Sequence, residues 1–163
     1  MSNVILIRGN SGSGKTTIAN DLHDFLGSGT LLISQDYVRR TMLKVHDKPG
    51  NLAIGLLESM ITYGIENCEY TIVEGILAKN KYEEMLIKCL EKADHIFVYY
   101  YDLSFEETLR RHLTKTNTDF GEDKMKNWFI PHDLLGIQHE KILTDSLSKE
   151  DALNMILHDL ALL

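Results

Sequence analysis

Short apolar runs and amphipathic segments alternate along the chain. The apolar runs at 4–7, 30–34, 70–73 and 95–101 predict strands, because each is short and bounded by polar or turn residues. The run at 95–101 is the longest and is predicted to be buried on both faces. Two apolar residues at 142–143 predict a short fifth strand. This alternation is typical of an α/β fold.

Between the strands, apolar residues recur every three or four positions, which predicts helices. The stripes that define these helices are Ile18, Leu22, Phe25 and Leu26; Val38, Met42 and Val45; Leu52, Leu56, Met60 and Tyr63; Tyr82 to Ala93; Phe105, Leu109 and Leu113; residues 125–129; and Ala152 to Leu160. Strands and helices in this order favour a three-layer α/β/α arrangement with a five-stranded, mainly parallel sheet. The chain length of 163 residues fits a single domain over 1–163.

The segment between the first strand and the first helix carries the most specific motif. It reads GNSGSGKT and fills the pattern G-x-x-x-x-G-K-[ST], which we call the P-loop. Backbone N–H groups of such a loop wrap a phosphate, the Lys15 ammonium reaches the β- and γ-phosphates, and the Thr16 hydroxyl can ligate Mg²⁺. The residues predicted to bind a nucleoside triphosphate are Gly9, Asn10, Ser11, Gly12, Ser13, Gly14, Lys15, Thr16 and Thr17.

Acidic residues follow the next three strands, at the edge where parallel sheets bind ligands. Asp36 is the candidate general base for a substrate hydroxyl, although Asp also caps helix N-termini. Glu74 ends an apolar strand and is the candidate for contact with Mg²⁺, its water or the substrate, the alternative being an ordinary charge at a strand end. For Asp102, a loop or capping role is as plausible as a functional one.

Two pairs of arginines are candidates for anion contacts. Arg39 and Arg40 follow Asp36 on the same predicted helix and could hold an anionic substrate, or simply face solvent. Arg110 and Arg111 precede a polar segment, and either could neutralise charge in the transition state. Spacing alone does not choose between them.

The polar segment at about 114–124 is predicted to be a flexible lid that closes over the nucleotide, with a surface loop as the alternative. Trp128, the only tryptophan, is predicted to anchor a short helix to the core. The segment Asp133–Gly136 matches the D-x-x-G of switch GTPases, but it follows Pro131 and His132 rather than an apolar strand. Because the N-K-x-D motif is also lacking, a GTPase switch is not predicted.

Net charge and cysteine content exclude some further classes of function and cellular environment. A formal net charge of −7 argues against nonspecific binding to nucleic acid or acidic membranes. Cys68 and Cys89 have no spacing that suits zinc or a redox pair, which predicts reduced thiols in a cytoplasmic protein. The apolar run at 4–7 is too short for a signal sequence or membrane span. The seven scattered histidines do not predict a metal other than Mg²⁺.

Three early motifs carry a family resemblance: RGNSGSGKTT, QDYVRR and VEGIL. With FEETLRRH, FGEDKMKNWF and PHDLLG, the chain from Val4 to about Asp151 resembles small bacterial P-loop kinases, in a zeta-toxin-like and nucleoside-kinase-like subset. The resemblance implies the P-loop kinase fold, Lys15 and Thr16 on ATP and Mg²⁺, and Asp36 as the general base. It also implies that one arginine of the pair Arg110 and Arg111 serves the phosphates.

The sequence thus predicts an ATP- and Mg²⁺-dependent phosphotransferase that moves the γ-phosphate to a hydroxyl of a small molecule. Its catalytic residues would be Lys15, Asp36 and one or both of Arg110 and Arg111. Two alternatives stay open: a nucleoside or nucleotide kinase, and a regulatory protein that binds a nucleotide without turnover. ATP rather than GTP, and the acceptor itself, are not decided by the residues.

Overall fold

The computed structural model describes residues 1–116 and 118–162. Its elements, in chain order, are β1 (Asn3–Gly9), α1 (Lys15–Leu26), β2 (Leu31–Ser34), the π-helix η1 (Tyr37–Leu43), α2 (Leu52–Asn67), β3 (Tyr70–Gly75), α3 (Lys79–Leu90), β4 (His95–Tyr101), α4 (Phe105–His112), α5 (Glu122–Trp128), β5 (Lys141–Leu143) and α6 (Lys149–Asp159). The predicted alternation of strands and helices is confirmed, including the short fifth strand.

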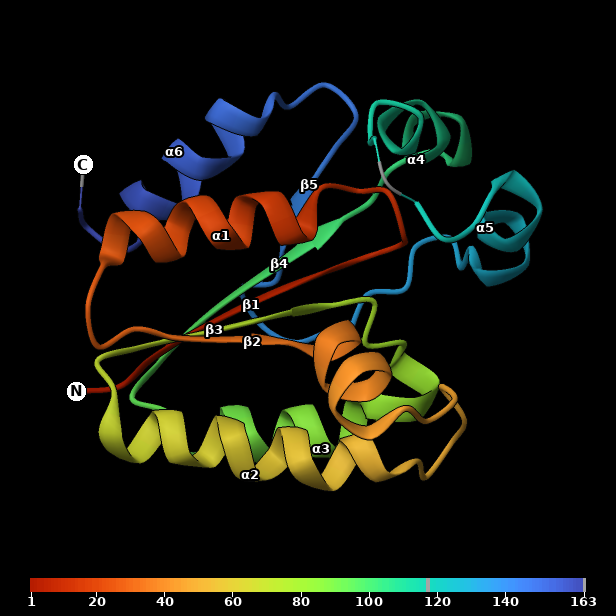
Figure 1. Ribbon diagram of the computed structural model, residues 1–163. Coiled ribbons are helices and arrows are strands. Elements are labelled where there is room, and N and C mark those ends of the chain that lie inside the picture. Colours follow the sequence, from red (N-terminus) through yellow and green to blue (C-terminus); the bar gives the residue numbers. More distant parts are fainter. Residues whose placement is uncertain (117, 163) are drawn as a thin grey trace.

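Within the described residues, five strands form one sheet in the order β2-β3-β1-β4-β5, and every pair of neighbours is parallel. Helices α1 and α6 cover one face and α2 and α3 cover the other (Figure 1). The predicted three-layer α/β/α fold is therefore confirmed. The sheet predicted as mainly parallel is parallel throughout.

Strand β1 lies at the centre of the sheet and contributes to two apolar cores. Val4 and Leu6 pack toward the side of α2 and α3, whereas Ile5 and Ile7 pack toward the side of α1 and α6. Successive side chains of a strand point to opposite faces, so a continuous apolar run suits a strand covered on both sides. This burial fixes the position of the P-loop, which follows directly.

Several predicted apolar stripes are offset from the buried faces. In α2 the buried residues are Ala53, Leu57, Ile61 and Gly64, while Leu52 and Tyr63 are exposed. The reason is close packing on the sheet: a Cβ on Gly64 would lie 2.3 Å from the Thr71 hydroxyl of β3.

Two further burial predictions are wrong in part. Phe25 of α1 is 53% exposed, although Ile18 and Leu22 are buried as predicted. Strand β4 is buried only in its second half, since His95 and Ile96 are exposed.

The carboxyl ends of β1 to β4 lie at one edge of the sheet. The P-loop, η1, the loop after β3, and helices α4 and α5 gather at this edge (Figure 1). None of the helices within residues 1–116 and 118–162 is long and apolar enough to span a bilayer.

Candidate active site

A cavity of about 890 Å³ opens at the carboxyl edge of the sheet. Its walls come from the P-loop, from η1 and the turn after it, from the end of β3 with the start of α3, and from the segment around α5. This is the edge at which open parallel sheets bind ligands. The volume is in the range of sites that hold small molecules.

The P-loop is held in the conformation that its glycines permit. Gly12 and Gly14 have φ angles of 83° and 101°, which are strained for residues with a side chain. A Cβ on Gly12 would also lie 2.5 Å from the Thr108 carbonyl oxygen of α4. Helix α1 then begins at Lys15 with no side-chain cap and no acidic residue in its first turn. Its first N–H groups are thus available to an anion.

Lys15 is buried beneath the loop. Its ammonium donates to the Asn10 carbonyl oxygen at 2.9 Å and to the Ser13 hydroxyl at 3.3 Å. Burial lowers the pKa of Lys15 to about 8, against the attraction of the nearby Glu74 carboxylate. A triphosphate beside this ammonium would favour its charged form.

Thr16 and Glu74 meet at the junction of α1 and β3. The Thr16 hydroxyl donates to a Glu74 carboxylate oxygen at 3.2 Å, and Glu74 is only 2% exposed. A hydroxyl and a carboxylate are hard oxygen ligands of the kind that Mg²⁺ takes. Residues 1–116 and 118–162 contain no cluster of three or more His, Cys, Asp or Glu that could hold a metal. The pair therefore fits Mg²⁺ that is also bound by phosphate oxygens and water.

Asp36 stands where β2 ends and η1 begins. Its side chain makes no capping hydrogen bond to the helix, so Asp36 does not have the alternative role of a side-chain helix cap. The carboxylate instead faces two arginines, with Oδ1 3.3 Å from Arg39 Nη2 and Oδ2 3.7 Å from Arg40 Nη1. Arg40 Nη2 also lies 3.6 Å from Asp119 Oδ2, in the segment between α4 and α5. All three residues of this acid–arginine group line the cavity.

The two arginines of α4 have different surroundings. Arg111 Nη1 donates to the Ser13 carbonyl oxygen of the P-loop at 2.7 Å, and Nε donates to Glu107 at 2.9 Å. The Arg110 side chain is 67% exposed and pairs with Glu107. Hydrogen bonds from both arginines lower the pKa of Glu107 to about 2. The structure thus brings Arg111, and not Arg110, to the P-loop.

The predicted lid, 114–124, covers nearly all of the connection between α4 and α5 and the first residues of α5. Residue 117 of the segment 114–124 lies outside the described residues. Phe120 stacks on His112 with centroids 4.9 Å apart and meets the Trp128 ring edge-on at 4.9 Å. Trp128 is 43% exposed and lines the cavity, so it is not simply an anchor in the core.

Not every predicted residue reaches the cavity. From the P-loop the lining residues are Ser11, Gly12, Lys15 and Thr16. The four predicted substrate residues, Asp36, Arg39, Arg40 and Glu74, all line it. Gly9 instead packs against β4: a Cβ on it would lie 2.8 Å from the Tyr101 Cβ. Asp102 contacts His132 Nδ1 at 2.8 Å.

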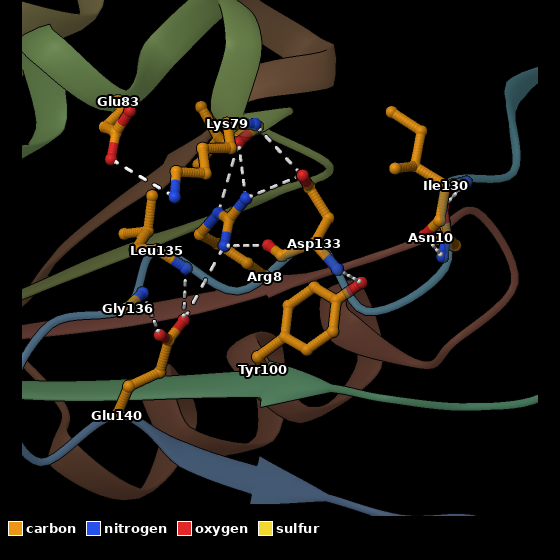
Figure 2. A network of polar contacts seen from close by, with 11 residues as sticks. Arg8, Asn10, Lys79, Glu83, Tyr100, Ile130, Asp133, Leu135, Gly136 and Glu140 are labelled. Atoms are coloured by element: carbon orange, nitrogen blue, oxygen red, sulfur yellow. Dashed lines mark hydrogen bonds and ion pairs between the residues drawn. The ribbon is translucent and has the colours of Figure 1, made fainter.

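Arg8, which was not among the predicted site residues, organises a buried polar network near the site (Figure 2). Its side chain is fully buried, and its Nε and Nη2 donate to the Leu77 carbonyl oxygen at 3.1 and 3.0 Å. It also donates to the Asp133 carbonyl oxygen at 2.8 Å and forms an ion pair with the Asp133 carboxylate at 2.9 Å. The sequence does contain a signal for this network, because an arginine at the end of a buried apolar strand requires a buried partner.

The partner segment, residues 130–136, is called the strap here. Its Ile130 exchanges two hydrogen bonds with the Asn10 side chain, at 2.7 and 2.9 Å. Its far end is held by Glu140, which accepts from the Leu135 and Gly136 N–H groups (Figure 2). The D-x-x-G match thus belongs to a segment that ties the end of α5 to β1 and the P-loop.

Comparison with known proteins agrees with this architecture. The chain matches solved structures of a gluconokinase from Sinorhizobium meliloti (TM-score 0.69, 14% identity, 98% of this chain and 91% of that one) and an APS kinase from Mycobacterium tuberculosis (0.68, 16%, 98% and 98%). It also matches a shikimate kinase from Acinetobacter baumannii (0.61, 20%, 99% and 93%). At these identities the likeness establishes the fold of small P-loop kinases. No curated protein sequence matches the chain.

The family is shown by a sequence model described as an AAA domain, which matches residues 4–121. This range contains the P-loop, Asp36, Glu74 and both arginines of α4. The chain belongs to the AAA domain family.

Proposed function

We propose that the protein is a phosphotransferase that moves the γ-phosphate of ATP to a hydroxyl group of a small molecule. One observation carries the proposal. The P-loop lines the same cavity as the acid–arginine group Asp36, Arg39 and Arg40, which follows the end of β2. A triphosphate and an acceptor can therefore meet there. A protein that only binds a nucleotide has no need of this acid–arginine group beside its P-loop.

Each residue has a role in this proposal. The P-loop backbone, the first turn of α1 and Lys15 hold the triphosphate. Asp36 accepts the proton of the attacking acceptor hydroxyl while the oxygen of that hydroxyl forms a bond to the γ-phosphorus. The bond from that phosphorus to the bridging oxygen breaks, and ADP leaves with the electron pair.

Thr16 and Glu74 are the residues that would hold Mg²⁺, Glu74 directly or through water. When bound, the ion would neutralise charge on the phosphate oxygens.

Arg111 is the arginine that we assign to the phosphates, because it already contacts the P-loop at Ser13. The lid at 114–124 would close over the nucleotide and bring Lys115 and Lys124, which line the cavity, toward its charge. Arg110 would have no direct part.

Two finer assignments belong to the same proposal. The zeta-toxin-like and nucleoside-kinase-like subset is favoured by the motifs FEETLRRH, FGEDKMKNWF and PHDLLG. A nucleotide kinase would use Arg39 or Arg40 for the phosphate of its acceptor. A single catalytic domain in the cytoplasm is expected from the chain length and the two free thiols.

The test is transfer to a mixture of acceptors. The protein is incubated with Mg²⁺, ATP carrying ¹⁸O in its γ-phosphate, and a deproteinised bacterial metabolite extract. Mass spectrometry should find a new compound that carries labelled phosphate. Lys15→Met protein should give none. Binding of ATP without any labelled product would contradict the proposal and favour a regulatory nucleotide-binding protein.

A further inference from the structure

The cavity carries a positive excess in a protein that is negative overall. Its lining has seven lysine or arginine side chains and four carboxylates, whereas the whole chain has a formal net charge of −7. Lys15, Lys115 and Lys124 belong to the P-loop and the lid. The remaining cations are Arg39, Arg40, Lys44 and Lys81, and we call their part of the cavity the acceptor end.

The carboxylates at the acceptor end do not neutralise these cations one for one. Asp36 is shared by the two arginines Arg39 and Arg40. A second carboxylate, Asp47, accepts from Lys81 at 3.4 Å and also from the Tyr82 hydroxyl. Glu74 lies between the acceptor end and the P-loop, and it accepts a hydrogen bond from Thr16 of the P-loop. Asp119, in the segment before α5, lies 3.6 Å from Arg40. Three carboxylates thus face four cations.

Arg39 is incompletely satisfied. Its Nη1 donates to the Val45 carbonyl oxygen at 3.0 Å and its Nη2 faces Asp36, but its buried Nε finds no acceptor in the described part of the chain. A buried donor of a charged group without a partner is costly. It is the kind of group that a ligand satisfies.

Lys44 is held at the cavity wall by an unusual backbone. It ends η1 with φ 54° and ψ 44°, in the left-handed region, and its N–H donates to the Arg39 carbonyl oxygen. A residue with a side chain is strained in this conformation, and such strain persists where the surroundings or a function require it. No ion pair to Lys44 within 4.0 Å occurs among residues 1–116 and 118–162.

We infer that the acceptor carries an anionic group in addition to its reacting hydroxyl, and that Lys44, Lys81 and Arg39 bind this group. The inference rests on the proposed function, because it names the class of its acceptor. A carboxylate and a phosphate present the same chemistry to two ammonium groups and a guanidinium.

Fractionation of the acceptor mixture tests the inference. The deproteinised extract is separated on an anion exchanger into a retained, anionic pool and an unretained pool, and each is incubated with protein, Mg²⁺ and labelled ATP. Labelled product should form from the retained pool alone. Product from the unretained pool would overturn the inference and leave the kinase function standing. Product from neither pool would contradict the proposed function itself and withdraw the inference with it.

Treatment of the retained pool with alkaline phosphatase separates the two sources of charge. If the acceptor activity is lost, the anionic group is a phosphate. If it persists, the group is a carboxylate or another anion that the phosphatase does not remove. Either result is compatible with the inference, and the comparison identifies the group.

Variants then place the binding site. Lys44→Gln and Lys81→Gln should each raise the KM for the retained-pool acceptor about tenfold, as expected for one charge-assisted hydrogen bond, with the KM for ATP unchanged. Lys92→Gln, on the exposed surface after α3, is the matched control and should change neither constant. If both lysine variants raised the KM for ATP instead, the cations would serve the triphosphate and the inference would be wrong.

Discussion

The Arg8 guanidinium and the Asp133 carboxylate form an ion pair at 2.9 Å, in which the Arg8 side chain is fully buried. The pair joins the strand that leads into the P-loop to the strap that follows α5 (Figure 2). The P-loop and the strap are therefore tied to the same strand.

We expect Asp133→Ala to lower the free energy of unfolding by about 3 kcal/mol, because it leaves a buried guanidinium short of its main counter-charge. The Glu140 carboxylate, 3.7 Å from Arg8 Nη1, and the carbonyl oxygens of Leu77 and Asp133 remain and prevent a larger loss. Urea unfolding measures the change. Glu83→Ala is the control, since Glu83 pairs with Lys79 at 3.6 Å near the surface, and it should cost less than about 1 kcal/mol. Equal losses would contradict the importance of the buried pair.

Asn10→Ala should loosen the end of α5. The variant loses both hydrogen bonds to Ile130, which should speed amide hydrogen exchange over residues 122–130 about tenfold. Hydrogen-exchange mass spectrometry reads this directly. Asn67→Ala removes an exposed bond to Tyr63 and serves as the control. Unchanged exchange in α5 would mean that the strap is held without Asn10.

Arg111→Ala should lower kcat by about 100-fold or more, as removal of a preorganised cation from developing phosphate charge does. Arg110→Ala should stay within about twofold of the unmodified protein, because the exposed Arg110 side chain pairs, among the residues that the structure describes, with Glu107 alone. Steady-state rates of the two variants decide between the two arginines. A larger loss with Arg110→Ala would reverse the assignment.

Binding of ATP should draw a proton onto Lys15 at alkaline pH. Its pKa of about 8 in the free protein is below its ordinary value because of burial, and phosphate charge beside the ammonium should raise it. At pH 8.5 roughly three quarters of a proton should be taken up per ATP, and at pH 7 about a tenth.

Calorimetry of Mg²⁺–ATP binding in buffers of different ionisation enthalpy counts these protons. Proton uptake that does not grow between pH 7 and pH 8.5 would show that the ammonium is already fully charged in the free protein.

Much of the fold could be predicted because the central strands are covered on both faces. The continuous apolar run of β1, followed by a complete P-loop motif, indicates strand, turn and helix together. The buried face of α2 could not be predicted, because the small residues Ala53 and Gly64 set it through close packing on β3. Hydrophobicity alone favours the larger Leu52 and Tyr63, which are exposed.

The candidate site, like the fold, could be predicted from the sequence only in part. Asp36 and Glu74 could be placed from sequence, since the ends of parallel strands share an edge. The choice of Arg111 over Arg110 depends on how α4 packs against the P-loop. The role of Asp133 depends on a contact 125 residues away along the chain. Neither leaves a periodic signal in the sequence.

The central claim is that Asp36 takes part in the chemical step of phosphate transfer and is not needed for the binding of ATP. The most direct measurement compares Asp36→Asn with the unmodified protein on one preparation, recording both the dissociation constant for Mg²⁺–ATP and the rate of label transfer from ATP to the metabolite extract. We predict a dissociation constant within about threefold and a transfer rate lower by at least about 100-fold. Transfer at an unchanged rate, or loss of ATP binding in proportion to activity, would contradict the account.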